Sequence, residues 1–321
     1  MKNTRVKAIA DTAVSAALCA LFIIIVTYVP ILSLPVSFAV SVPLMYITLR
    51  HGAKFSILAC LCAFLVSFFL IGNALSVGFL FLTYAVPGLV FGICSSKKMR
   101  FPLSIALSAL SVLISFVIEL ALINGGGDGI ANMINSITQS MGDALKSSIA
   151  QTQILPAGDI DVYISEVMAQ TSNMFLLSLP TITIATSVVY AYITSMVGVF
   201  FLKRLRLASV DYTKFYMICA PRSMCIITFI LLLIIQLGRI EGTYGAALQN
   251  LYNLSVLYIS VCGLSSIDYS FKNKISSGIL RAVIYIIIFL TGFMFGSLTI
   301  TILTVIGYLD GLNGRRLGRK A

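Results

Sequence analysis

The chain has 321 residues, of which 59% are hydrophobic and 10% are charged, and its formal net charge is +11. A soluble domain carries about 25% charged residues, so this composition excludes a soluble enzyme, a disordered protein and a disulfide-rich secreted scaffold. The Lys and Arg residues cluster between apolar runs, which indicates membrane topology and contact with anionic lipid rather than nucleic-acid binding. We therefore predict an all-α, polytopic transmembrane helix bundle whose first partner is the lipid bilayer.

Five apolar runs in the first 124 residues are long enough to cross a bilayer, which needs roughly 20 residues. They are Ala13–Val29, Ile31–Leu49, Ala53–Ile71, Leu75–Cys94 and Pro102–Asn124. In the second run, Pro35 and Pro43 predict an irregular first third, because lone prolines break helices. Gly72 and Asn73 predict a tight turn between the third and fourth runs.

A long polar segment, Gly125–Asn173, follows the fifth run. Its apolar residues recur at helical spacing up to Ile149, which predicts an amphipathic helix of about six turns that breaks at Pro156. A second amphipathic stretch leads into the sixth span, Met174–Leu202. The segment holds five acids and a single base, Lys146, which is typical of an external face.

Three further apolar runs follow, Ser223–Leu237, Leu248–Ile267 and Ile279–Tyr308. The last of them has 30 residues and as one helix would rise about 45 Å, too far for one comfortable span. We interpret it as a hairpin of two helices that turns near Gly292–Gly296. The whole chain then has about 8–10 spans.

The distribution of Lys and Arg predicts the orientation. With the amino terminus in the cytoplasm, every Lys and Arg except Lys146 and Arg239 lies inside, and the last hairpin returns the basic tail to that side. This topology divides the chain into a five-span part (1–124), an external helical segment (125–173) and a C-terminal membrane part (174–321).

Glu119 is the one acid well inside an apolar run. An intramembrane carboxylate is a functional-site hypothesis by default, and it would bind a cationic substrate group or carry a proton. Alternatively, its carboxylate reaches the outer headgroups, and both interpretations stay open. The single histidine, His51, is expected to be an interface residue rather than a catalyst.

The sequence carries none of the short motifs that indicate common membrane enzymes or metal sites. Its seven cysteines form no CxxC pair, and there is no Walker A, HExxH or GxSxG motif. We therefore predict no catalytic residue, metal or cofactor, and any ATP-driven transport would need a separate ATPase chain.

Small residues recur on the first helix at Ala13, Ala16, Ala17 and Ala20. Such a face lets helices approach closely in lipid. It serves either packing within the chain or docking of another membrane subunit. Gly88 and Gly92 likewise predict a close helix contact.

Several stretches together carry a family resemblance. They are the alanine-rich first helix, Val42–Leu44, Leu49–Gly52, the turn at Gly72, Tyr84–Gly92 and Ile306–Asp310. The chain resembles the YybS-like family of bacterial integral membrane proteins, whose first half is similar to the substrate-binding S components of energy-coupling-factor vitamin transporters.

That resemblance implies an S-component-like part of six helices in the bacterial cytoplasmic membrane, and the distribution of Lys and Arg predicts that both termini lie inside. S components bind a vitamin near the outer face and contact a coupling subunit through an Ala-xxx-Ala face on the first helix. By resemblance, Ala16 and Ala20, with Ala13 and Ala17 a turn away, are the coupling contacts.

These observations lead to one principal functional hypothesis and two alternatives. The principal one is binding or uptake of a vitamin or another metabolite in an outward pocket near Glu119, with segment 125–173 as a lid. The lid would present an adaptable apolar surface of Met133, Met141, Met168 and Met174. The first alternative is a non-transport scaffold tied to the envelope or to sporulation, and the second is a lipid-modifying enzyme with Glu119 as base.

The predicted topology is open to direct test with reporter fusions. A fusion at Asn135 should report the external side and a fusion at Ala321 the cytoplasm, because the hairpin returns the basic tail inside. Paired alkaline phosphatase and fluorescent-protein reporters measure this. If both positions report the external side, the hairpin is wrong.

Overall fold

The computed structural model describes residues 2–123, 127–152, 157–207, 214–238, 242–274, 280, 283–285, 287–288 and 296–314. Secondary structure in these residues is helical, with no strand. The chain divides into two compact units, Met1–Tyr212 and Thr213–Ala321, and each is described by itself.

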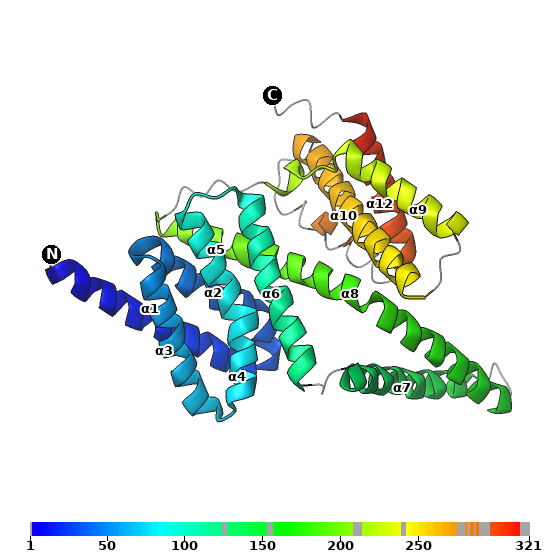
Figure 1. The fold of residues 1–321 in the computed structure, drawn as a ribbon, viewed down its shortest axis with the longest axis horizontal. Coiled ribbons are helices and arrows are strands. Elements are labelled where there is room, and N and C mark those ends of the chain that lie inside the picture. Colours follow the sequence, from blue (N-terminus) through cyan, green and yellow to red (C-terminus); the bar gives the residue numbers. More distant parts are fainter. Residues whose placement is uncertain are drawn as a thin grey trace. The chain divides into compact units, whose positions relative to one another are not determined.

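The first unit contains eight helices and one π-helical turn in its described residues (Figure 1). They are α1 (Lys2–Tyr28), α2 (Pro30–His51), α3 (Ala53–Ile71), α4 (Ala74–Leu80), the π-helical turn Phe81–Ala85, α5 (Val86–Ser96), α6 (Phe101–Ile123), α7 (Gly127–Thr152) and α8 (Ala157–Arg204). The second unit contains a 3₁₀ turn (Phe215–Met217), α9 (Arg222–Gly238), α10 (Gly242–Lys274) and α12 (Gly296–Asn313).

Within the described residues, seven helical segments are long and apolar enough to cross a membrane, and Arg222–Gly238 is a shorter apolar helix. The five spans expected before residue 124 are all found, with α4, the π-helical turn and α5 together forming the fourth. The polytopic helix bundle is therefore confirmed. The total of 8–10 spans and the three-part division by topology stay predictions.

Helix α2 is continuous, which corrects the expectation that its first third is irregular. Pro30 takes the first helical position, where the helix needs no backbone N–H. The Ser33 hydroxyl donates to the Pro30 carbonyl at 2.8 Å, and Ser37 donates in the same way one turn later. Membrane helices tolerate interior prolines where neighbouring helices and local adjustments satisfy the freed backbone groups, and α2 packs against α1, α3, α5 and α8.

The α3–α4 turn confirms the tight connection predicted at Gly72 and Asn73. Gly72 adopts a φ of +76° at the end of α3, a left-handed conformation that glycine tolerates without a steric cost. The Asn73 side chain then caps α4 by accepting a hydrogen bond from the Ser76 backbone N–H at 3.1 Å.

Glycines bring α5 directly against α2, as the sequence predicted. A Cβ at Gly88 would lie 2.7 Å from both the Cα and the carbonyl oxygen of Ser41. A Cβ at Gly92 would lie 2.9 Å from the Thr48 Cβ. The spacing of four residues places both glycines on one helix face, so the two backbones approach along a full turn.

The π-helical turn Phe81–Ala85 lies just before Pro87. A proline has no N–H, and its ring would meet the carbonyl one turn earlier in a regular α-helix. The wider turn relieves this conflict. The Tyr84 carbonyl accepts a hydrogen bond from the Ser41 hydroxyl of α2 at 2.5 Å, so α2 satisfies a backbone group in the irregular turn.

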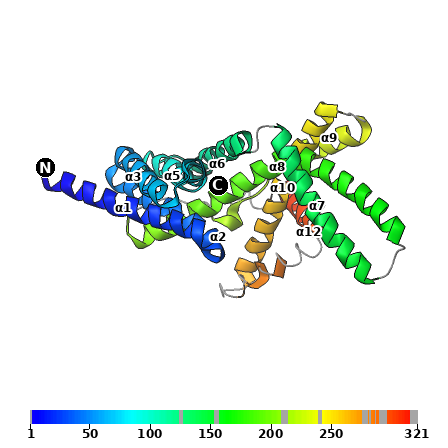
Figure 2. The same cartoon turned by 90° about the horizontal axis from the view of Figure 1, so that it is seen from below.

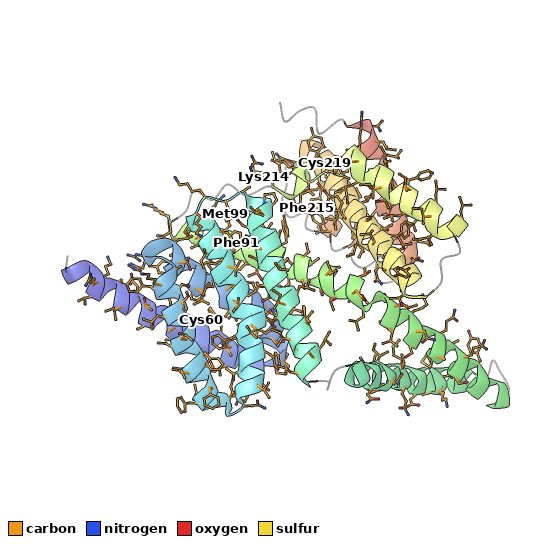
Figure 3. The ribbon with its side chains drawn as sticks, in the orientation of Figure 1. Cys60, Phe91, Met99, Lys214, Phe215 and Cys219 are labelled. Atoms are coloured by element: carbon orange, nitrogen blue, oxygen red, sulfur yellow. The ribbon has the colours of Figure 1, made fainter. Side chains whose placement is uncertain are left out.

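Two apolar clusters hold the first unit together. The first joins α1, α2, α3 and α4 with the π-helical turn and consists of Ala16, Cys19, Ala20, Ile23, Val40, Leu44, Ala59, Ala63, Val77, Phe81 and Ala85. The second joins α2, α5, α6 and α8 and includes Phe91, labelled in Figure 3, which meets Phe101 edge-on at a ring-centroid distance of 6.0 Å. Small residues dominate the first cluster, which permits close helix packing in lipid.

Helices α7 and α8 pack side by side as a hairpin (Figure 2). The structure confirms the predicted amphipathic helix, whose buried side presents Ile134, Thr138 and Gly142. It also shows that the second amphipathic stretch and the sixth span form one helix, α8, of 48 residues. A helix of that length rises about 70 Å, more than twice the roughly 30 Å hydrocarbon core. The predicted break at Pro156 lies outside the described residues.

The second unit uses the same close packing between α10 and α12. A Cβ on Gly263 or on Gly307 would overlap the backbone of the facing helix. The Ser260 and Thr304 hydroxyls are hydrogen bonded at 2.7 Å between the same helices. The predicted turn at 292–296 lies outside the described residues except for Gly296, where α12 begins.

The close α2–α5 contact predicts that Gly88→Ala destabilises the protein. The added methyl group would meet the Ser41 backbone, and such overpacking costs about 1–3 kcal/mol. Gly78→Ala is the matched control, because no atom lies within 4 Å of a Cβ built there. Thermal unfolding of the detergent-solubilised chain, followed by size-exclusion chromatography, measures the difference. Equal melting temperatures for the two variants would contradict the close contact.

Candidate functional site

A cavity of about 490 Å³ in the first unit contains the one intramembrane acid that the sequence singled out. Its lining comes from α2, α4, the π-helical turn, α6 and α8. The lining residues are Ser33, Leu34, Ser37, Phe38, Ser76, Phe79, Leu80, Thr83, Tyr84, Phe116, Glu119 and Tyr190. Ligand pockets typically measure about 300–1,000 Å³, so the cavity has the size of a metabolite site.

The cavity lies where α2 and α4 begin and where α6 ends. Ser33 and Ser76 belong to the first turns of their helices, and Glu119 belongs to the last two turns of α6. With the predicted cytoplasmic amino terminus, all three helix ends lie on the external side. The cavity then faces outward.

Three aromatic rings from different elements form one wall of the cavity. The Phe38 and Tyr190 ring centroids are 5.2 Å apart, and those of Tyr84 and Tyr190 are 5.8 Å apart. Both pairs are tilted, with interplanar angles of 30° and 43°. Aromatic pairs favour this range of separations, so α2, α8 and the π-helical turn present a continuous aromatic surface.

Three of the six hydroxyl groups in the described lining donate their protons within the protein. Ser33 and Ser37 donate to carbonyls of α2, and the Tyr190 hydroxyl donates to the Ser37 carbonyl at 3.0 Å. Thr83 shares a hydrogen bond of 2.8 Å with Ser115 of α6. The oxygen lone pairs of these groups remain as acceptors, so the lining offers a ligand more acceptors than donors.

Glu119 is half-buried at the cavity. The lining described by the structure contains this one carboxylate and no Lys, Arg, His or Cys. Among the described residues, no cation lies within ion-pair distance of it. A carboxylate beside aromatic rings and oxygen acceptors is suited to hold a protonated nitrogen or to carry a proton.

The four alanines of the first helix divide between two sides of α1. Ala16 and Ala20 are buried in the cluster with α2 and α3, whereas Ala13 and Ala17 are exposed. The packing interpretation therefore holds for Ala16 and Ala20. A coupling subunit would have only Ala13 and Ala17 of this set within reach.

His51 has partners at the other end of the α1–α2 pair. Its Nε2 atom lies 2.8 Å from the Asp11 carboxylate, and the Arg50 guanidinium lies 3.5 Å from the same oxygen. Arg50 also donates to the Tyr46 hydroxyl. This cluster joins the third turn of α1 to the end of α2, which agrees with a structural role for His51 at the interface.

In the second unit, Lys214 and Lys272 lie beside the ring of Tyr216, which belongs to the 3₁₀ turn Phe215–Met217. The Lys272 ammonium lies 3.8 Å from the centroid of the Tyr216 ring. A hydrogen bond from Lys272 lowers the pKa of Tyr216 below its usual value, because it favours the phenolate form.

The described residues of the predicted lid do not line this cavity. The described lining residues include none from α7 or from the first part of α8. Met141 and Met174 are exposed, while Met168 lines a separate groove between α7 and α8; the side chain of Met133 lies outside the described residues. A lid formed by segment 125–173 therefore stays a prediction, and it would require a conformation other than the one described.

Sequence reasoning found Glu119 but missed the aromatic and hydroxyl residues around it. Phe38, Tyr84 and Tyr190 come from three separate apolar runs, where an aromatic residue is common and carries no motif. One local signal was available: Tyr84 precedes Pro87 by three residues, and a proline in a helix predicts a distortion just before it. Asp11 was also missed as the partner of His51.

Comparison with known protein families matches one family model, described as a predicted membrane protein (DUF2232), over residues 17–310. No curated protein and no solved structure matches the chain. The family match runs from α1 into α12 and includes every lining residue of the cavity. The chain therefore belongs to the DUF2232 family of predicted membrane proteins.

Proposed function

We propose that this membrane protein binds a small metabolite in the Glu119 cavity and takes part in its uptake, in the manner of an S component. The cavity carries the proposal: it joins a metabolite-sized volume, an aromatic wall and a carboxylate with no cationic partner among the described residues. Metabolite sites combine apolar and aromatic walls with a few polar groups in this way.

The rest of the first unit supports a binding role over a catalytic one. The described lining offers a single carboxylate, with no His, Lys, Cys or second carboxylate beside it to act as its partner in acid–base or covalent catalysis. Its aromatic residues are fixed by packing and by interhelical hydrogen bonds. Such preorganisation lowers the entropy cost of binding a ligand.

A metabolite that copurifies with the chain tests the proposal. Ser33→Trp would place a large ring in the cavity and displace the ligand, whereas Ile31→Trp is the matched control because Ile31 is 91% exposed on the same helix. Native mass spectrometry of the full chain in mild detergent should show a bound metabolite in the wild type and in Ile31→Trp. It should be absent from Ser33→Trp. No bound metabolite in the wild type, or equal retention by both variants, refutes the binding role.

One observation favours the scaffold as a second candidate function. Ile137, Met141 and Leu145 form an exposed apolar stripe along α7, which a partner protein would cover. If the protein instead works as an S component, the coupling subunit would contact the exposed residues Ala13 and Ala17 of α1.

Site-specific photo-crosslinking in cells distinguishes the two functions. A crosslinker at Ala17 should capture a polytopic subunit that copurifies with an ATPase chain if the protein is an S component. Ser147, exposed on α7, serves as a control position outside both apolar faces. Capture of an envelope protein from Ile137, with none from Ala17, would favour the scaffold and contradict coupled uptake.

A further inference from the structure

We infer that the ligand of the Glu119 cavity is an organic cation with an apolar or aromatic body, an inference that rests on the proposed binding function. The inference follows from the chemistry of the lining. Charge, aromatic faces and hydrogen-bonding capacity each select for the same kind of molecule.

The first selecting feature is charge. Glu119 is the single formally charged group in the described lining, and no Lys, Arg or His accompanies it. An anionic ligand would lose its hydration and meet a like charge in a region of low dielectric constant. A ligand cation would supply the counter-charge that the described protein does not place beside Glu119.

The second feature is the aromatic wall. Phe38, Tyr84 and Tyr190 lie with neighbouring ring centroids 5.2 and 5.8 Å apart, and Phe79 and Phe116 add two more rings to the lining. The face of an aromatic ring is negative and attracts ammonium groups, most strongly where water is excluded. Rings on several sides also accept the apolar body of the ligand.

The third feature is the excess of acceptors. The hydroxyls of Ser33, Ser37 and Tyr190 donate to backbone carbonyls, which leaves their oxygens as acceptors toward a ligand. A carboxylate ligand needs hydrogen-bond donors, and the hydroxyl protons of these three groups already take part in hydrogen bonds within the protein. A protonated amine carries up to three donors and finds acceptors here.

A matched series of ligands tests the inference. Phenethylammonium, 2-phenylethanol and 3-phenylpropionate share an aromatic body and differ in being cationic, neutral and anionic at pH 7. The chain contains no tryptophan, so a Phe116→Trp variant of the full chain carries a single fluorescent reporter in the cavity. Phe69→Trp, at a residue 79% exposed on α3, is the control for nonspecific partitioning into detergent.

Phenethylammonium should change the fluorescence of Phe116→Trp but not of Phe69→Trp, and should bind about tenfold more tightly than 2-phenylethanol. 3-Phenylpropionate should bind most weakly. Adding Glu119→Gln should remove most of the preference for the cation over the alcohol, whereas Glu166→Gln, at an exposed carboxylate of α8 outside the lining, should keep it.

The outcomes separate this inference from the proposed function. Binding of the alcohol or the anion as tightly as the cation, no binding of the cation, or a preference unaffected by Glu119→Gln would overturn the cation inference. If a neutral or anionic metabolite still copurifies with the wild type and is lost in Ser33→Trp, the binding function stands and only the ligand class is wrong.

Discussion

The contact between Ser41 of α2 and the turn before Pro87 is the constraint on which the first unit depends. The hydrocarbon core contains no water to satisfy a backbone carbonyl, so an irregular turn there needs a protein donor. Ser41 supplies it to Tyr84, and Gly88 lets the two backbones meet at that point. This contact sets the position of the π-helical turn, and with it the Tyr84 ring that continues the aromatic wall to Tyr190.

The same requirement explains where hydroxyl residues lie in this bundle. Ser56 of α3 donates to the Leu44 carbonyl of α2 at 3.0 Å, and Ser108 of α6 donates to the Pro87 carbonyl at 3.3 Å. Lipid is as apolar as leucine, so burial of large apolar side chains cannot drive helices together in a membrane. Small and hydroxyl residues therefore face inward, while many of the large apolar residues of α3 and α6 are exposed.

The sequence predicted the elements well because membrane spans have a simple physical signature. Length and hydropathy located the five early spans, and helical periodicity located α7. The continuity of α2 was missed because prolines argue against a helix locally, whereas helices that pack around α2, such as α5 and α8, come from distant parts of the sequence. The cavity was only half predictable: a lone carboxylate is visible in an apolar run, but the aromatic partners of Glu119 depend on helix packing.

Helix pairing would have revealed one contact that local patterns did not. Helices α1 and α2 form an antiparallel pair around Pro30, so residues at equal distances from the turn lie at the same level. Asp11 and His51 lie 19 and 21 residues from Pro30, close to this condition, and are hydrogen bonded at 2.8 Å. The pairing also matters for the proposed cargo. With the predicted orientation, Glu119 lies at the external end of the bundle, while Arg50 and Lys54 lie at the cytoplasmic end.

In the proposed uptake function and orientation, a cation leaving Glu119 would travel toward a basic cytoplasmic face, which repels it. The membrane potential, negative inside, favours its entry by about 2.3 kcal/mol per elementary charge for each 100 mV. Under this proposal, Glu119 would retain the cation at the external end, and inward release would need the membrane potential or a coupled ATPase chain. In the proposed function, the few charged residues of the chain would thus act directly on the bound cation.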